Sequence, residues 1–171
     1  KRPTQPALPK VNRVAVLVPL TGPDAAVGQA LERSARLALL DSQSQAFQIS
    51  VYDTAEGGAG AAAARAASAG HGLILGPLRS EEVRAVTPIA QRARVPVITF
   101  SNDATAAAQG SYILGFTPAQ AIERVVIEAA TKGARRFAAL VPASDYGQRS
   151  SQALLAAVQR VGGQVTAVET Y

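Results

Sequence analysis

The sequence predicts an α/β fold, an open parallel sheet with helices on both faces. Short runs of β-branched and apolar residues, such as Val14–Val18, have no polar face, which is typical of strands buried in a parallel sheet. Segments with one apolar helical face follow these runs. Pro and Gly separate the two kinds of segment, so strand and helix alternate along the chain, as they do where right-handed crossovers connect parallel strands.

Seven strands are expected from the apolar runs. Three of them are followed by residues that end regular structure: Pro19, Gly76 and Pro118. The predicted strands cover residues 14–18, 47–52, 73–75, 96–99, 112–116, 137–141 and 164–168. Between them, residues 53–60 are expected to form a Gly-rich loop and residues 100–111 a polar loop.

Five helices are expected in the intervening segments. The first has Val27, Leu31, Ala35 and Leu39 on one face. The third is expected to have Ser80 as its N-cap, with two glutamates in the first turn, where the helix dipole favours them. The predicted helices cover residues 24–40, 61–69, 80–93, 118–132 and 146–161.

The composition fits small residues packed closely between helices and a sheet. Of 171 residues, 36 are Ala and 14 are Gly, and 5% are aromatic. The length suits one domain, or one and a half. No apolar run reaches the roughly 18 residues that a membrane span needs.

The sequence favours a protein that is not an enzyme and holds no metal or other cofactor. It has no Cys and one His, which excludes disulfides, thiolate chemistry and multi-histidine metal sites. The single histidine, His71, is expected before the third strand, at the edge of the sheet opposite the carboxyl ends of the strands, where ligands bind in such sheets. There is no GxSxG elbow, and the Gly57–Gly60 cluster is not a phosphate-binding motif. No catalytic residue is therefore expected.

The charge is basic but does not indicate nucleic-acid binding. The net charge is +5, and 14 of the 17 basic residues are Arg. These arginines are scattered and do not alternate with aromatic residues, as a face that binds single-stranded nucleic acid would require. We interpret them as a solvated surface.

Ligand-binding candidates lie at the carboxyl ends of the predicted strands, because open parallel sheets bind ligands there. Ser80 has two interpretations: its hydroxyl and the following backbone N–H groups could hold a carboxylate or phosphate, or Ser80 could be an ordinary N-cap. The candidates from this argument are Thr21, Gly22, Asp53, Ser80, Ser101, Asn102 and Asp103.

Three segments resemble the type I periplasmic binding proteins. The segment VAVLVPLTGPDAAVGQALERSARLAL is similar to their opening, GPLRSEEVRAVTPIAQRARVPVITFS to their Gly-x-x-x-Ser helix and Val-Pro strand, and FAALVPASDYGQRSSQALLAAVQRVGGQV to the start of their second lobe. The resemblance implies a lobe over residues 11–117 and the start of a second lobe over residues 118–171. It also implies that a ligand such as an amino acid lies between the lobes, with Tyr146 packing on it.

Within that family, four motifs resemble the penicillin-binding protein activator lipoproteins of Gram-negative bacteria. They are YDT at residues 52–54, GPLRSEEV, TFSND and DYGQR. This resemblance implies a non-catalytic periplasmic protein that contacts and stimulates a penicillin-binding protein, a peptidoglycan synthase. Residues 1–10, with Pro at every third position, would then be a tether from an upstream lipid anchor in the outer membrane. The alternative is the substrate-binding component of an ABC importer for branched-chain or related amino acids.

Overall fold

The structure is a computed structural model that describes residues 12–171, so the tether expected at residues 1–10 lies outside the described residues. The chain divides into two compact units, one ending at Gly115 and the other spanning Phe116–Tyr171. Within residues 12–171, every helix falls short of the length and hydrophobicity that crossing a bilayer requires.

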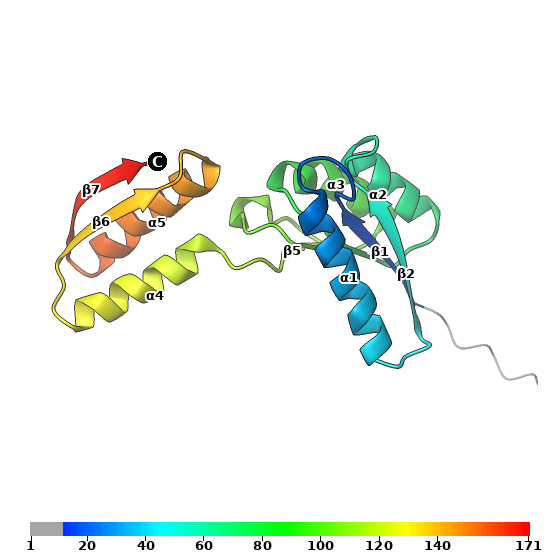
Figure 1. Ribbon diagram of the computed structural model, residues 1–171, viewed down its shortest axis with the longest axis horizontal. Helices are drawn as coiled ribbons and strands as arrows, with labels where there is room; N and C mark the ends of the chain where they lie inside the picture. The colour runs from blue at the N-terminus through cyan, green and yellow to red at the C-terminus, as the bar shows by residue number, and fades with distance from the viewer. Residues whose placement is uncertain (1–11) are drawn as a thin grey trace, which may run out of the picture. The chain divides into compact units, whose positions relative to one another are not determined.

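The first unit is built on a five-stranded parallel sheet (Figure 1). Its strands lie in the order β2-β1-β3-β4-β5, so β1 is paired with β2 on one side and with β3 on the other. The bounds are β1 (Asn12–Val18), β2 (Phe47–Asp53), β3 (Leu73–Leu75), β4 (Val97–Thr99) and β5 (Ser111–Ile113). The parallel α/β sheet predicted from the buried apolar runs is confirmed.

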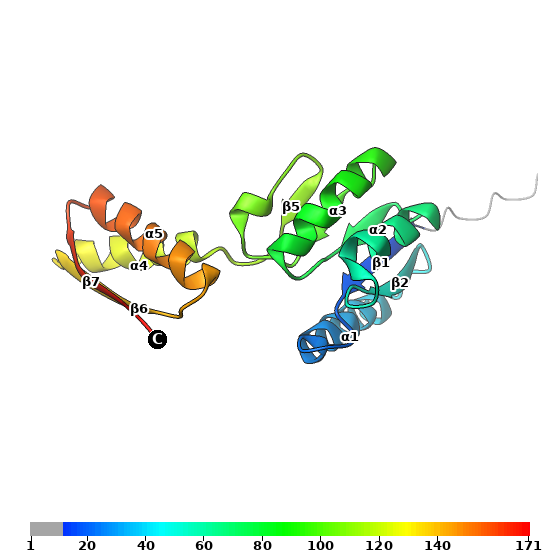
Figure 2. The ribbon, with the colours of Figure 1, turned by 90° about the horizontal axis from the view of Figure 1, so that it is seen from above.

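Helices cover both faces of this sheet. Figure 2 shows α1 (Ala25–Asp41) on one side, and α2 (Gly58–Ser68) and α3 (Ser80–Ala93) on the other. The face under α2 and α3 holds the larger of the two core clusters. Helix α2 contributes only alanine to it, and the strands contribute mainly branched residues. Its buried members are Ala15, Leu17, Ala59, Ala62, Ala63, Ala66, Ile74, Val86, Ala90 and Val97. Alanine lets α2 lie close to the sheet, which explains the composition.

The second unit has a two-stranded parallel sheet of β6 (Arg136–Val141) and β7 (Gln164–Thr170). Helices α4 (Pro118–Thr131) and α5 (Asp145–Arg160) pack on one face of it (Figure 2). The buried core is small and consists of Val126, Leu154, Ala157 and Val158, with partly buried residues such as Phe137 against it.

The same strand ending occurs in both units. The sequence from Arg13 to Pro19, RVAVLVP, matches that from Arg136 to Pro142, RFAALVP, at five of seven positions. In each unit, a glycine in the first turns of the next helix lies against the carbonyl of that proline. A Cβ on Gly28 would lie 1.8 Å from the Pro19 oxygen, and one on Gly147 would lie 1.9 Å from the Pro142 oxygen. No side chain fits at either contact.

Several element boundaries differ from the predicted ones. Helix α2 begins at Gly58, not Ala61, because Gly57 adopts a positive φ of 73° and turns the chain one residue before. Strand β5 ends at Ile113, not Phe116, because its neighbour β4 offers only three residues for pairing. The predicted polar loop of residues 100–111 contains a short 3₁₀ helix, η1 (Ala104–Ala106).

Candidate functional site

The carboxyl edge of the first sheet brings Asp53 and Thr21 together. Asp53 is the last residue of β2, and its Oδ1 accepts hydrogen bonds of 2.9 Å from the backbone N–H groups of Leu20 and Ala55. Its Oδ2 accepts a bond of 2.8 Å from the Thr21 hydroxyl. Desolvation raises the pKa of Asp53, but these hydrogen bonds together hold it below its ordinary value. The carboxylate therefore ties the loop after β1 to the end of β2.

Gly22 forms the turn that follows Thr21. Its φ of 78° lies in the left-handed region, which glycine adopts without strain. Its carbonyl accepts a hydrogen bond of 3.2 Å from the N–H of Ala25, the first residue of α1. Gly22 is exposed, and the structure shows it as the residue that turns the chain from β1 into α1.

Ser80 is not the N-cap that the sequence predicted. The helix α3 begins at Ser80, and Arg79 stands at the N-cap position. The Glu82 carboxylate accepts a hydrogen bond of 3.1 Å from the Arg79 backbone N–H. Ser80 Oγ instead lies 3.4 Å from Oε2 of its neighbour Glu81. The prediction failed because a capping glutamate three residues into the helix satisfies the residue before Ser80.

An ion pair that the sequence analysis missed joins the loops after β1 and β3. Arg79 Nε lies 2.6 Å, and Arg79 Nη2 2.5 Å, from Asp24 Oδ2. The hydrogen bond with Asp24 is the largest cause that raises the pKa of Arg79 above its ordinary value. The sequence did contain a signal for this ion pair. Asp24 and Arg79 carry opposite charges, and each lies between a predicted strand and the helix that follows it.

Ser101 and Asp103 form a buried, hydrogen-bonded loop after β4. The Asp103 N–H donates to Ser101 Oγ at 3.1 Å, and the Ser101 N–H donates to Thr99 Oγ1 at 3.0 Å. Asp103 Oδ1 accepts bonds from the backbone and hydroxyl of Thr105, at 3.0 and 2.7 Å, and so caps η1. Ser101 is 4% exposed and Asp103 2%, while Asn102 between them is half-buried. These groups hold the loop in place.

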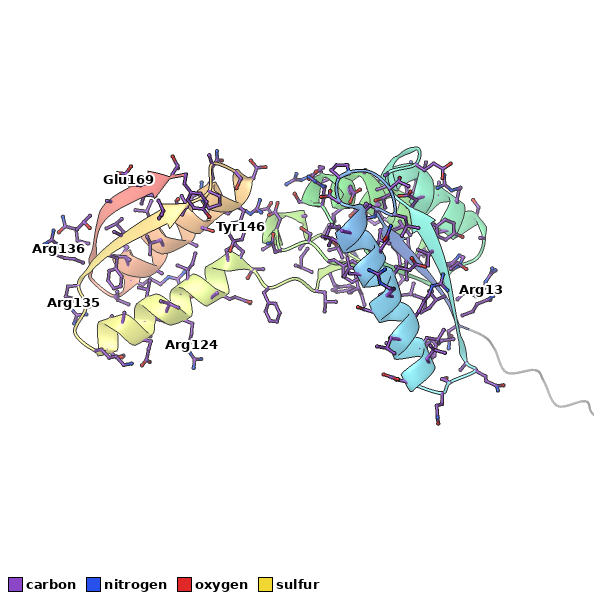
Figure 3. The ribbon with its side chains drawn as sticks, viewed as in Figure 1. Arg13, Arg124, Arg135, Arg136, Tyr146 and Glu169 are labelled. Carbon is purple, nitrogen blue, oxygen red and sulfur yellow. The ribbon has the colours of Figure 1, made fainter. Side chains whose placement is uncertain are left out.

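Tyr146 belongs to the second unit, where it lies in the first turn of α5 (Figure 3). Its side chain is 45% exposed, and its backbone carbonyl accepts a hydrogen bond from Ser150. A cavity of about 440 Å³ is present at the carboxyl edge of β6 and β7. Its lining is Val141, Pro142, Ala143, Ser144, Asp145, Gly147, Gln148, Ser151 and Thr170, which does not include Tyr146.

His71 is buried in the first unit and packs edge-on against the Tyr52 ring, with centroids 5.6 Å apart. Its Nδ1 lies 2.9 Å from the Ala66 carbonyl oxygen. Among residues 12–171, no three His, Asp or Glu side chains gather as a metal site would require.

Comparison with known proteins identifies the family. The family model described as "LppC putative lipoprotein" matches residues 7–171. The chain belongs to the LppC family. The penicillin-binding protein activator LpoA of Photobacterium profundum is 26% identical to it over 167 residues, which is 95% of this chain. The uncharacterized protein RP748 of Rickettsia prowazekii is 28% identical over 146 residues, or 85% of this chain.

This LppC chain spans about a third of the length of these relatives, 39% of the Rickettsia protein and 27% of the Photobacterium one. Solved structures share its fold. The C-domain of Haemophilus influenzae LpoA, a regulator of PBP1A, aligns over 93% of this chain and 50% of its own, with a TM-score of 0.72 and 20% identity. A branched-chain amino acid transporter protein of Rhodopseudomonas palustris aligns over 93% of this chain and 47% of its own, with a TM-score of 0.76 and 18% identity.

These alignments give the architecture of the LppC chain. The five-stranded parallel sheet and the small second sheet are the fold of a type I periplasmic binding protein, of which this chain covers about half. The resemblance to this fold and to the penicillin-binding protein activator lipoproteins, inferred from the sequence motifs, is confirmed.

Proposed function

We propose that this LppC protein is a non-catalytic periplasmic lipoprotein that activates a peptidoglycan-synthesising penicillin-binding protein. The observation that carries the proposal is the match to the LpoA activator over 95% of the chain. The mechanism would be protein–protein contact that shifts the synthase towards its active state. The protein would be anchored in the outer membrane by a lipid upstream of residue 1, without a cofactor and without binding nucleic acid.

The hydrogen bonds among polar side chains at the carboxyl edge of the first sheet favour this role over solute binding. Polar groups that would hold a solute are bonded to one another instead: Asp53 to Thr21, Ser101 to Asp103, and Arg79 to Asp24. A solute would compete with these bonds for the same polar groups, which lowers the free energy that its own hydrogen bonds could contribute.

The test uses the full-length mature protein and the bifunctional penicillin-binding proteins of its own bacterium. Pull-down and synthesis assays would measure binding and the rates of glycan polymerisation and cross-linking. We expect binding of one synthase and an increase in one of these rates. A solute-binding protein of the same fold, tested at equal concentration, is the control and should leave the rates unchanged. No binding and no stimulation of any of these synthases would refute the proposal.

The alternative function is the substrate-binding component of an importer for branched-chain or related amino acids, which the likeness to the Rhodopseudomonas protein favours. Its ligand would be held by Thr21, Gly22, Asp53, Ser80, Ser101, Asn102, Asp103 and Tyr146. A thermal-shift screen of the full-length protein against amino acids and small peptides separates the two functions. A rise of several degrees with one amino acid supports the importer, and a flat screen counts against it.

A further inference from the structure

The Arg79–Asp24 ion pair lies at the topological switch point of the first sheet. Strands β1 and β3 are neighbours, and the chain leaves them for helices on opposite faces, α1 and α3 (Figure 2). In open α/β sheets this is the place where ligands bind. The first N–H groups of both helices lie there, and helix N-termini favour negative charge.

Asp24 meets Arg79 instead of capping its own helix. It occupies the N-cap position of α1 but makes no side-chain cap hydrogen bond. Its Oδ2 instead accepts from the guanidinium of Arg79, the N-cap residue of α3, at 2.6 Å. The Asp24 side chain is 29% exposed and that of Arg79 51%, so the pair lies at the surface, within reach of small solutes.

Two further acidic residues, Glu81 and Glu82, lie close to Arg79. Glu81 Oε1 lies 3.7 Å from Arg79 Nη1, and Glu82 Oε2 accepts from the Arg79 backbone N–H at 3.1 Å. Arg79 therefore faces three carboxylates of its own chain, and the local charge is negative. A free anion would have to compete with Asp24 for the guanidinium and overcome this repulsion.

We propose that Asp24 is an internal substitute for the acidic group of a ligand. It occupies the switch point, pairs with Arg79 and keeps small anions from binding there. This inference goes beyond the proposed function, since it concerns only the switch point of the first unit and holds whether or not the chain activates a synthase.

The experiment measures the binding of inorganic phosphate to the whole chain, by thermal shift and calorimetry at constant ionic strength. The key variant is Asp24→Ser/Glu81→Gln, which removes both carboxylates from the Arg79 guanidinium; serine is a residue that N-cap positions favour. We expect it to bind phosphate about tenfold more tightly than the unaltered chain, which is the effect of one freed charged hydrogen-bond donor. Adding Arg79→Gln should abolish the gain.

The matched control is Glu32→Gln/Asp41→Asn, which removes one acid from the middle of α1 and one from its C-terminal end. It should bind phosphate no better than the unaltered chain. Circular dichroism establishes that each variant is folded. Equal phosphate affinity of the unaltered chain and the key variant would overturn the proposal, as would a gain that survives Arg79→Gln. This experiment does not use the synthase assay, so a failure of the proposed function and a failure of this inference can be told apart.

Discussion

At the residue scale, the polar groups at the carboxyl edge act first as structural ties. Asp53 accepts three hydrogen bonds, two of them from backbone N–H groups in different loops. The sequence placed Thr21 and Asp53 correctly at strand ends, because parallel strands must end at one edge. It could not show that they bond to each other, since pairing depends on strand order, which no local pattern contains.

We predict that Asp53→Asn makes the stability of the chain less dependent on pH. The pKa of Asp53 is lowered by folding, so its contribution is present above its unfolded value of about 3.8 and is lost as pH falls through the folded value. At pH 7 the variant should be less stable by about 1 kcal/mol, since an amide replaces only some of the hydrogen bonds. The difference should shrink below about pH 3.8.

Denaturant unfolding between pH 2.5 and 7 measures this difference. Thr21→Ala is the companion variant: it removes only one of the three hydrogen bonds, so its loss at pH 7 should be smaller. A difference between Asp53→Asn and the unaltered chain that stays constant with pH would contradict the assigned role of the carboxylate.

We also predict that Gly28→Ala destabilises the first unit by about 3 kcal/mol, because its Cβ would lie 1.8 Å from the Pro19 oxygen and force the helix away. Gly147→Ala should do the same in the second unit, where the Pro142 oxygen is at 1.9 Å. Gly72→Ala is the control, since nothing lies within 4 Å of its Cβ and its φ is not positive. Thermal unfolding should show that only the control keeps its stability.

At the scale of elements, most strands and helices could be predicted from the sequence. Buried branched runs such as Val14–Val18 identify strands because they have no polar face, and β3 (Leu73–Leu75) matches its predicted bounds. The failures occurred where tertiary contacts outweigh local preference. Helix α2 includes Gly58 and Gly60, which disfavour helices, because the alanines of this helix, from Ala59 on, are buried against the sheet and hold the first turn in place.

The alanine face of α2 leads to a prediction about packing. Ala63 is fully buried against the sheet, so Ala63→Leu inserts three carbon atoms where no space exists. We expect a loss of about 1–3 kcal/mol in unfolding free energy. Ala64→Leu on the same helix is the control, because Ala64 is exposed. Equal stability of the two variants would show that the alanine face is not closely packed.

At the scale of the whole molecule, the two units differ in how much core they have. The first unit has helices on both faces of a five-stranded sheet, whereas the second has a core cluster of four buried hydrophobic residues and one covered face. A two-stranded sheet is at best marginally stable unless helices pack against it. The sequence indicated a second lobe that is only begun, but not how little of it would be buried.

We predict that Leu154→Ala unfolds the second unit alone. Leu154 is 8% exposed in the core beside α4, and its truncation costs about 2–5 kcal/mol, a large part of the stability of a small unit. Leu155→Ala is the control, since Leu155 is 51% exposed. In NMR spectra, signals of residues 116–171 should collapse while those of residues 12–115 stay dispersed. Simultaneous loss of both sets would contradict separate cores.

The contact between Gly28 and Pro19 also determines which parts of the molecule can vary freely. Where the helix meets the strand end, backbone atoms alone set the spacing, and no side-chain volume enters it. Changes in the side chains between α1 and the sheet can therefore alter the tilt of α1 at its far end, while its first turn stays at a fixed distance from the end of β1. Asp24, which directly precedes α1, thus keeps its position at the carboxyl edge when those side chains change.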